Sequence, residues 1–333
     1  MTQHAPQTLT AAPRRAVVTG AAGFIGSHLA HALVQAGTVV VGVDRRAPAT
    51  DRAAAANLAA LQPLPTYLHV TADLLDCAIE PLLVDADVVF HLAGVPGVRP
   101  SWGPEFSEYV ACNVLATHRV MDAARHMGVP RLVVASSSSV YGPTDGGASV
   151  ETDRLQPASP YAVTKLAEEQ LCLAHARHTR CPASVVALRY FTVYGPRQRP
   201  DMFTHRALEA ALTGRPLRLY GDGHQRRDFT YVDDAVAATI AAAGAPATDE
   251  VINVGGGSNA SLLEVINIAK SLTGREIRVR QENPRSGDVL TTRANPRRAH
   301  EVLGWQPQVG LHNGMRAQMQ ALTAESTAYG HAA

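Results

Sequence analysis

Cysteine is scarce in this chain, and its spacing excludes two common kinds of site. The 333 residues include four cysteines, none in a C-x-x-C pair: Cys77, Cys112, Cys172 and Cys181. Neither a zinc site nor a redox motif is indicated, and we expect no bound metal. Because scattered, reduced cysteines are typical of cytosolic proteins, we expect a cytoplasmic location. A chain of this length buries enough core to fold without disulfides.

The chain also lacks an excess of charge and lacks long apolar segments. Lys and Arg total 30 and Asp and Glu total 29, so the formal net charge is +1. This balance, with only 5% aromatic residues and no aromatic-basic clusters, argues against nucleic acid as a partner. No run of about 18 apolar residues occurs, so we expect no membrane-spanning helix and no membrane partner. Residues 1–15 are polar without the apolar core of a signal peptide, and we expect a loose tail there.

Short β-branched runs alternate with helical stretches in the first half of the chain. We expect strands at 16–19, 38–43, 66–70, 88–92, 132–135 and 184–188, and helices at 27–36, 54–61, 109–127 and 161–177. Apolar strands separated by helices are typical of a parallel sheet covered on both faces. The pattern predicts an α/β fold: a Rossmann-like, doubly wound parallel sheet with a smaller C-terminal α/β substrate-binding region.

The rhythm changes after Arg189, where prolines and arginines become denser. We predict that residues 14–190 form a nucleotide-binding domain, to which 228–254 return, with a strand and a helix within 229–244. Residues 191–227 and 255–325 form the smaller region. Because no repeat or low-complexity linker separates the two regions, we expect them to enclose a single cleft.

A glycine-rich loop connects the first expected strand to the first helix. It reads Thr-Gly-Ala-Ala-Gly-Phe-Ile-Gly over residues 19–26. Gly20 allows the tight turn, Gly23 lets the backbone approach a pyrophosphate, and Gly26 lets the helix pack on the strand. The free amides of the helix N-terminus favour the phosphate charge. Because the loop has the strand-turn-helix context that this mechanism needs, it predicts a dinucleotide site.

Asp44 ends the second strand, eighteen residues after Gly26. A carboxylate there accepts hydrogen bonds from ribose hydroxyls and repels a 2′-phosphate, which favours NAD over NADP. Arg45 and Arg46 follow directly and favour NADP instead, since arginine suits a 2′-phosphate. We predict NAD. Asp73 is a further predicted cofactor residue, and the alternative for it is a helix cap. The remaining cofactor residues predicted are Phe24, Ile25, Asp73, Leu74, Leu92, Ala93, Gly94 and Asn113.

Tyr161 and Lys165 lie four residues apart on an expected helix and so share a face. A lysine ammonium beside a phenol lowers the phenol pKa, and the phenolate can take a proton from a sugar hydroxyl while hydride moves to a nicotinamide. The serine run 136–139 ends a strand where open parallel sheets bind ligands. Alone, each feature is typical of a helix surface or a turn. Together with the glycine loop, and in this order along the chain, they are a specific signal for a catalytic site that uses a dinucleotide.

The chain resembles the extended short-chain dehydrogenases/reductases, and among them the UDP-glucuronate 4-epimerases, over residues 14–321. The resemblance rests on the blocks 93–99, 135–142, 188–202 and 227–234. It implies a catalytic triad of Ser137, Tyr161 and Lys165, the last two also contacting NAD, and a UDP-sugar substrate. It further implies a homodimer through the helices near 109–127 and 161–177. An actinomycete moenomycin-pathway epimerase fits the same pattern, which implies antibiotic biosynthesis as the context.

Ser138 and Ser139 favour an epimerase over the other relatives. Dehydratases and uronate decarboxylases of this superfamily carry acidic residues in this stretch, and serine cannot move protons as those acids do. A 4-keto uronate loses CO2 easily unless its carboxylate is held out of alignment with the ketone. Hydroxyls and an arginine can hold it by charge-assisted hydrogen bonds. We expect Ser138, Ser139 and Arg197 to form this carboxylate clamp, with Arg99 as a second candidate and a solvated Arg197 as the alternative.

Arginines of the second region are expected to hold the nucleotide diphosphate, because their planar fork suits it. The resemblance assigns Arg227 and Arg285 to this task, and Thr192 as a further hydrogen-bonding residue. The predicted substrate residues are thus Arg99, Ser137, Ser138, Ser139, Tyr161, Thr192, Arg197, Arg227 and Arg285. The open alternatives are a UDP-hexose 4-epimerase, a UDP-glucuronate decarboxylase and a non-catalytic cofactor sensor.

Overall fold

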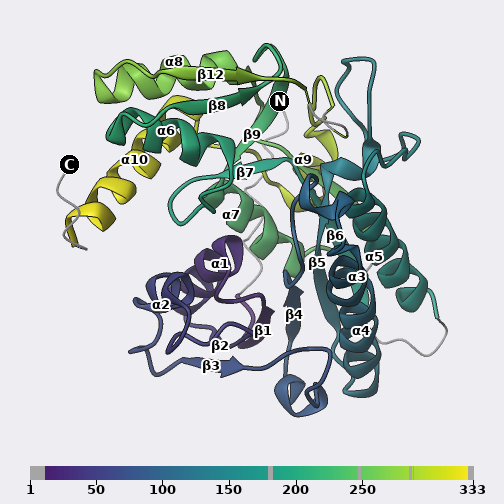
Figure 1. The fold of residues 1–333 in the computed structure, drawn as a ribbon. Coiled ribbons are helices and arrows are strands. Elements are labelled where there is room, and N and C mark those ends of the chain that lie inside the picture. Colours follow the sequence, from purple (N-terminus) through teal and green to yellow (C-terminus); the bar gives the residue numbers. More distant parts are fainter. Residues whose placement is uncertain (1–11, 179–182, 247–248, 285–286, 288, 329–333) are drawn as a thin grey trace, which may run out of the picture.

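The structure is a computed structural model that describes residues 12–178, 183–246, 249–284, 287 and 289–328. A parallel seven-stranded sheet forms its centre (Figure 1). In spatial order the strands are β10 (Glu250–Val254), β6 (Ser184–Tyr190), β5 (Arg131–Ser137), β4 (Val88–His91), β1 (Arg15–Thr19), β2 (Val39–Asp44) and β3 (Tyr67–Thr71). The predicted Rossmann-like α/β fold is confirmed.

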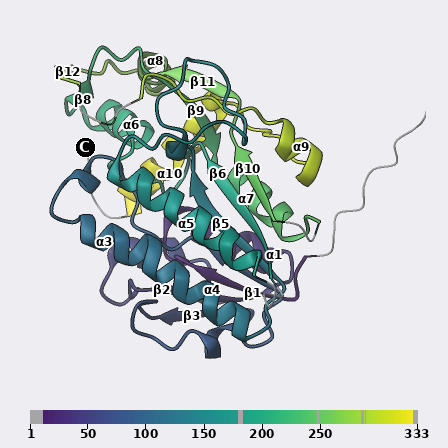
Figure 2. The same cartoon turned by 90° about the vertical axis from the view of Figure 1, so that its right-hand side faces the viewer.

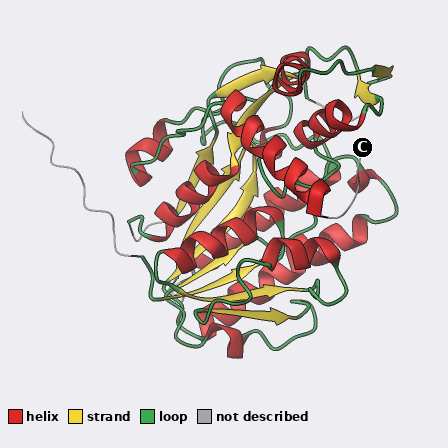
Figure 3. Ribbon diagram, turned by 90° about the vertical axis from the view of Figure 1, so that its left-hand side faces the viewer, coloured by secondary structure: helices red, strands yellow, loops and turns green. Residues whose placement is uncertain are grey.

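Each central strand is buried on both faces because its alternate residues enter two different cores. Val18, Val40 and Phe90 belong to one hydrophobic cluster, whereas Val17 and Val41 belong to the other. Helices cover both faces: Figures 2 and 3 view the molecule from opposite sides, and each shows helices in front of the strands. These helices are α1 (Phe24–Gln35), α2 (Arg52–Leu58), α7 (Val232–Ala243) and α9 (Arg297–Leu303) on one side, and α3 (Phe106–Val110), α4 (Ala116–His126) and α5 (Pro160–Ala176) on the other.

The expected helix at 109–127 is present but is divided. A π-helical turn, η3 (Ala111–Leu115), separates α3 from α4. Three short 3-10 helices occupy connections elsewhere: η1 (Glu80–Leu83), η2 (Pro100–Trp102) and η4 (Ser138–Tyr141). The expected strand ends differ from the observed ones by a few residues.

The second region packs at the carboxyl ends of the central strands (Figure 1). A three-stranded sheet has the order β11 (Ser258–Ser261), β9 (Arg226–Tyr231) and β7 (Thr192–Tyr194), and a parallel pair joins β12 (Val279–Glu282) to β8 (Leu217–Tyr220). Three helices complete it: α6 (Phe203–Thr213), α8 (Leu262–Thr273) and α10 (Leu311–Ala328). Among the described helices, none has the length and apolar character needed to cross a membrane.

The return of residues 228–254 to the first domain differs from the expectation at its strand. Helix α7 packs on β5, β6 and α1, and β10 extends the central sheet, but β9 pairs with β7 and β11 instead. The sequence of β9 explains this, since Arg226, Arg227 and Asp228 would have to enter an apolar sheet centre. The Arg226 guanidinium donates to Asn259 Oδ1 at 2.8 Å, and Asp228 Oδ2 accepts the Ala294 amide at 2.9 Å.

Candidate active site

A cavity of about 930 Å³ opens where the carboxyl ends of the central strands meet the second region. It brings together residues that lie far apart in the sequence. Most of the predicted site residues line it: Gly20, Gly23, Phe24, Ile25, Gly26, Asp44, Asp73, Leu74, Leu92, Ala93, Gly94, Asn113, Ser137, Ser138, Ser139, Tyr161, Lys165, Thr192, Arg197 and Arg227. Arg99 is outside this lining, and Arg285 lies outside the described residues.

The glycine loop forms one wall of the cavity and leaves no room for side chains. Gly20 has φ +71, and a Cβ there would lie 2.9 Å from the Ala93 nitrogen. A Cβ on Gly26 would overlap the Gly20 carbonyl oxygen. Helix α1 begins after Gly23, and among the described residues no side chain caps its first amides. The loop therefore offers bare main chain and a helix N-terminus, which fits the pyrophosphate of a dinucleotide.

Asp44 lies at the end of β2, where a ribose would reach it. It is 8% exposed; one carboxylate oxygen accepts the Ala22 amide at 3.0 Å and the other accepts the Arg46 amide at 3.0 Å. The Arg46 guanidinium also contacts Asp44 at 3.3 Å, whereas Arg45 pairs with Glu108 of α3 at 2.6 Å. Each arginine that follows Asp44 is thus paired with a carboxylate of the protein.

Tyr161 and Lys165 stand one turn apart at the start of α5. The helix begins here because the Ser159 hydroxyl accepts the Ala162 amide at 3.1 Å and Pro160 takes the first helical position. The Tyr161 ring lies edge-on to the Tyr109 ring, with centroids 6.2 Å apart. This helix start places both predicted catalytic side chains in the lining of the cavity.

The serine run lies beside them at the end of β5. Ser137 Oγ accepts the Ser139 amide at 3.2 Å and the Ser139 hydroxyl at 2.9 Å. This local bonding turns the chain directly from β5 into η4 and leaves Ser137, Ser138 and Ser139 on the cavity wall. The wall there offers hydroxyl groups next to Tyr161 and carries no carboxylate of its own.

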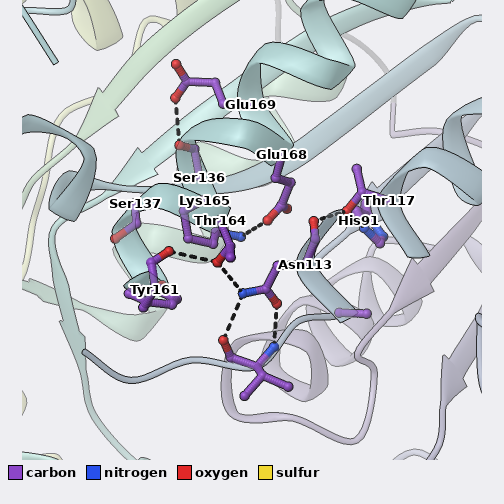
Figure 4. A network of polar contacts seen from close by, with 12 residues as sticks. His91, Asn113, Thr117, Ser136, Ser137, Tyr161, Thr164, Lys165, Glu168 and Glu169 are labelled. Atoms are coloured by element: carbon purple, nitrogen blue, oxygen red, sulfur yellow. Dashed lines mark hydrogen bonds and ion pairs between the residues drawn. The ribbon is translucent and has the colours of Figure 1, made fainter. Parts of the chain in front are cut away.

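Asn113 connects the π-helical turn to the cavity. Its side chain accepts the Val95 amide at 2.7 Å, donates to the Val95 carbonyl at 3.1 Å and donates to the Thr164 hydroxyl at 3.0 Å (Figure 4). The Thr164 hydroxyl in turn donates to the Tyr161 carbonyl at 2.8 Å. Asn113 therefore fixes the loop after β4 against the first turn of α5.

A buried histidine lies behind Asn113, and sequence reasoning missed it. His91 Nδ1 is 2.8 Å from the Thr19 hydroxyl, and Nε2 is 2.9 Å from the Thr117 hydroxyl. Burial lowers the pKa of His91 to about 3, and the charge of Lys165 acts in the same direction. His91 is therefore neutral, and it supports the glycine-loop strand and α4 through hydrogen bonds.

Two buried glutamates on α5 were also missed. Lys165 Nζ donates to Glu168 Oε2 at 2.5 Å, and the Arg189 guanidinium donates to both oxygens of Glu169 at 2.7 and 2.9 Å. The Ser136 hydroxyl adds a 2.6 Å bond to Glu169. Their positions, three and four residues after the lysine, are the signal that would have revealed them, because both share its helix face.

The loop between β7 and α6 carries the arginines nearest the cavity. Arg197 is one of two described non-glycine residues with positive φ, at +62, and its Nη1 donates to the Ser27 hydroxyl of α1 at 3.3 Å. Buried Gln198 fixes the loop by bonds to the Val193 carbonyl at 3.0 Å and from Gln318 at 2.8 Å. The predicted clamp residue Arg197 thus contacts the helix that follows the glycine loop.

Arg199 also lines the cavity, and sequence reasoning did not select it. Its guanidinium binds Asp201 in a bidentate manner at 2.8 and 2.9 Å. Burial raises the pKa of Tyr109, and the charge of Arg199 opposes that rise. Arg199 therefore lines the cavity with its guanidinium held by Asp201 of the same loop.

Arg99 and Arg227 occupy different positions. The Arg99 guanidinium lies over the Tyr220 ring, 4.5 Å from its centroid, and so joins η2 to β8. Arg227 lines the cavity and donates to the Arg226 carbonyl at 2.8 Å. Arg227, the predicted diphosphate residue, therefore lines the cavity, whereas Arg99, the second candidate for the carboxylate clamp, does not.

Comparisons with known proteins agree with this geometry. The chain is 45% identical to MoeE5, solved in complex with UDP-glucuronic acid and NAD, covering 93% of this chain and 99% of that one with a TM-score of 0.86. It is 39% identical to a UDP-glucuronic acid 4-epimerase from Bacillus cereus in complex with UDP-glucuronic acid and NAD, over 93% and 99%, with a TM-score of 0.89.

A third relative is an uncharacterized UDP-glucose epimerase, YtcB, of Bacillus subtilis (strain 168). It is 40% identical over 311 residues, which cover 92% of this chain and 98% of that protein. The names of the two Bacillus relatives agree with the predicted isomerase class. The model of the NAD dependent epimerase/dehydratase family matches residues 16–255, and its description confirms the predicted dependence on NAD. The chain therefore belongs to the NAD dependent epimerase/dehydratase family.

Proposed function

We propose that this protein is a UDP-glucuronate 4-epimerase, which interconverts UDP-glucuronic acid and UDP-galacturonic acid. The observation that carries the proposal is the wall of hydroxyls, Ser137 to Ser139, next to Tyr161 and Lys165 in a cavity that fits a dinucleotide. The complexes of MoeE5 and the Bacillus cereus enzyme with UDP-glucuronic acid support the same substrate. The coarser activity, a UDP-sugar 4-epimerase that uses NAD, follows from the same residues.

Tyr161 acts as the base in this proposal. It removes the proton of the C4 hydroxyl, the ammonium of Lys165 stabilises the phenolate, and Ser137 donates a hydrogen bond to the reacting oxygen. NAD, when bound along the glycine loop and Asp44, supplies the acceptor and later the donor of the C4 hydride. The 4-keto sugar turns about its bond to the diphosphate and so presents the other face of C4 for return of the hydride, while Tyr161 gives the proton back to the C4 oxygen. The cofactor is therefore not consumed.

The same site must keep the sugar carboxylate from leaving as CO2. Ser138 and Ser139 are suited to hold it by hydrogen bonds, together with an arginine of the loop between β7 and α6. Arg197 is the candidate that the sequence favours. Arg99, the second candidate from the sequence, lies outside the cavity lining. Arg199 lines the cavity, and we place it ahead of Arg197 because the Arg197 guanidinium donates to Ser27 of α1.

The second region holds the nucleotide in this proposal. Thr192 and Arg227 line the cavity and are suited to bind the diphosphate, and Arg285 stays a prediction. This assignment goes with the proposed division of the chain, in which residues 14–190 bind the cofactor and residues 191–227 and 255–325 bind the nucleotide sugar. The cytoplasmic location and the role in antibiotic biosynthesis also stay predictions.

We also propose a homodimer through α4 and α5. Apolar side chains stand exposed where these helices begin, among them Leu115 at 51% and Val163 at 49% exposure. A second copy packed on this face would bury them. Sedimentation at micromolar concentration is expected to give the mass of a dimer, and a monomer there would contradict the proposal.

Product analysis by NMR tests the function. Incubation with UDP-glucuronic acid is expected to give UDP-galacturonic acid with retention of the carboxylate, and incubation with UDP-glucose is expected to be much slower. Release of CO2 with a UDP-pentose as the main product would contradict the proposal and favour the decarboxylase. Faster turnover of UDP-glucose would favour the hexose epimerase.

A further inference from the structure

The predicted catalytic lysine has a buried carboxylate as its neighbour. Lys165 Nζ lies 2.5 Å from Glu168 Oε2, and the two side chains are 8% and 0% exposed. The other oxygen of Glu168 is buried and has no hydrogen-bond partner among the described residues. A buried carboxylate with one unsatisfied oxygen is costly, which makes a purely structural reason for Glu168 weak.

The next residue on the helix gives a direct contrast. Glu169 is equally buried, but Arg189 binds both of its oxygens and Ser136 adds a further bond. Its charge is thus neutralised within the protein core. The cation that faces Glu168 is Lys165, the same ammonium that acts on the Tyr161 phenol (Figure 4).

We propose that Glu168 is a positioning residue that sets the proton affinity of Tyr161 through Lys165. The ammonium of Lys165 binds the Glu168 carboxylate and interacts through its charge with both Glu168 and Tyr161. Lys165 favours the phenolate, and the negative charge of Glu168 opposes it while keeping the buried ammonium charged. The inference rests on the proposed function only in taking Tyr161 as the base. Because that base must remove and return the same proton, a proton affinity balanced in this way suits a reversible epimerisation.

The other titratable groups around Lys165 bring no uncompensated charge to it, so the proton affinity of Tyr161 depends on Lys165 and Glu168. On α5 itself these are Tyr161, Glu169 and Cys172; from the elements packed on it they are His91 of β4, Arg189 of β6 and Tyr109 of α3. His91 is neutral, and Arg189 and Glu169 form an ion pair with each other. Burial raises the pKa of the Cys172 thiol and so keeps it protonated. Burial raises the pKa of Glu168 to about 7 against the opposing charge of Lys165, so its charge changes near neutral pH.

The test is the substitution Glu168→Gln in the enzyme as purified with its cofactor. Glutamine keeps the shape and an acceptor for Lys165 but removes the charge. The tyrosinate absorbance assigned to Tyr161, by difference from the Tyr161→Phe variant, is expected to titrate about one pH unit lower. The acidic limb of the kcat/KM profile for UDP-glucuronate is expected to move by the same amount and in the same direction.

Two further variants keep the test decisive. Glu169→Gln is the matched control: it removes a buried charge one residue away, and its thermal stability is expected to fall without a move of the Tyr161 titration. Glu168→Asp keeps the charge one methylene farther from Lys165, so a smaller shift in the same direction is expected. This variant carries the test if Glu168→Gln does not fold.

An unchanged Tyr161 titration, or one that moves to higher pH, would overturn the inference. The titration is read without any sugar, so it stands apart from the choice of substrate. A decarboxylated product would contradict the proposed function while leaving the titration of Tyr161 intact. The absence of any titration assignable to Tyr161 would instead remove the base on which both depend.

Discussion

The two sides of the cavity are made of different parts of the polypeptide. The side formed by β1, β2 and α1 presents bare backbone at Gly20, Gly23 and Gly26, together with the carboxylate of Asp44. The side formed by the end of β5 and the loop after β7 presents hydroxyl and guanidinium groups. A backbone surface suits a ligand that never changes, whereas side chains can be exchanged to change the sugar that reacts. The cofactor side is therefore expected to be intolerant of substitution and the sugar side to tune specificity.

The largest effect is expected where the two sides meet, at Tyr161. Tyr161→Phe removes the base but keeps the ring against Tyr109, so the epimerase rate is expected to fall by about 10²- to 10⁴-fold while NAD stays bound. Product formation by NMR and the cofactor content of the purified protein measure the two effects. Tyr109→Phe is the matched control, and an equal loss of rate in that variant would argue against Tyr161 as the base.

The next effect tests the cofactor side alone. Gly26→Val would press a side chain against the Gly20 carbonyl, and overpacking of this kind costs about 1–3 kcal/mol or more. We expect protein purified with much less NAD, with a lower melting temperature and a loss of turnover of every UDP-sugar in proportion to the missing cofactor. Gly37→Ala lies in open space at a helix end and serves as the comparison, although its φ of +89 costs some stability. Retention of NAD by Gly26→Val would contradict the role of the loop.

The same difference decides what the sequence reveals in advance. The glycine loop, Asp44 and the strand-helix alternation were predictable, because backbone conformation and burial leave local patterns. Glu168 had a local signal that went unused, its position three residues after Lys165 on the same helix. His91 had none, because Thr19 and Thr117 reach it only through tertiary packing.

The arginines and β9 show the same limit from another side. The sequence alone does not distinguish Arg197 from Arg199 in a proline-rich loop, and only the fold shows that one donates to Ser27 of α1 and the other pairs with Asp201. The β9 run has the composition of a strand, but its place in the three-stranded sheet depends on β7 and β11, which lie far from it in the sequence.

The third largest effect is expected from two substitutions on the sugar side of the cavity. Arg199→Ala is expected to raise KM for UDP-glucuronate about tenfold, since a hydrogen bond to a charged group contributes about 1.5 kcal/mol, and to leave KM for UDP-glucose nearly unchanged. Arg197→Ala is expected to affect both substrates alike, because the Arg197 guanidinium donates to Ser27 of α1 on the cofactor side. Steady-state kinetics with both sugars measure the difference. The reverse pattern would return the clamp to Arg197, as the sequence suggested.

The smallest expected effect is a pH dependence of stability caused by Glu168. Burial raises the pKa of Glu168 to about 7, above that of a glutamate in the unfolded chain, so the folded protein binds this proton more tightly. The resulting stability is full below the unfolded pKa and is lost as the pH rises through about 7. Calorimetry is expected to show a melting temperature lower by about 3 °C on the alkaline side of this transition, and Glu168→Gln is expected to abolish the change. Asp122→Asn is the control of opposite sign, because the Arg125 hydrogen bond lowers the pKa of Asp122 and its contribution is lost only in acid. If the melting temperature of Glu168→Gln falls with rising pH as much as that of the unchanged protein, another group causes the transition. The Glu168 carboxylate would then be charged beside Lys165 throughout the neutral range.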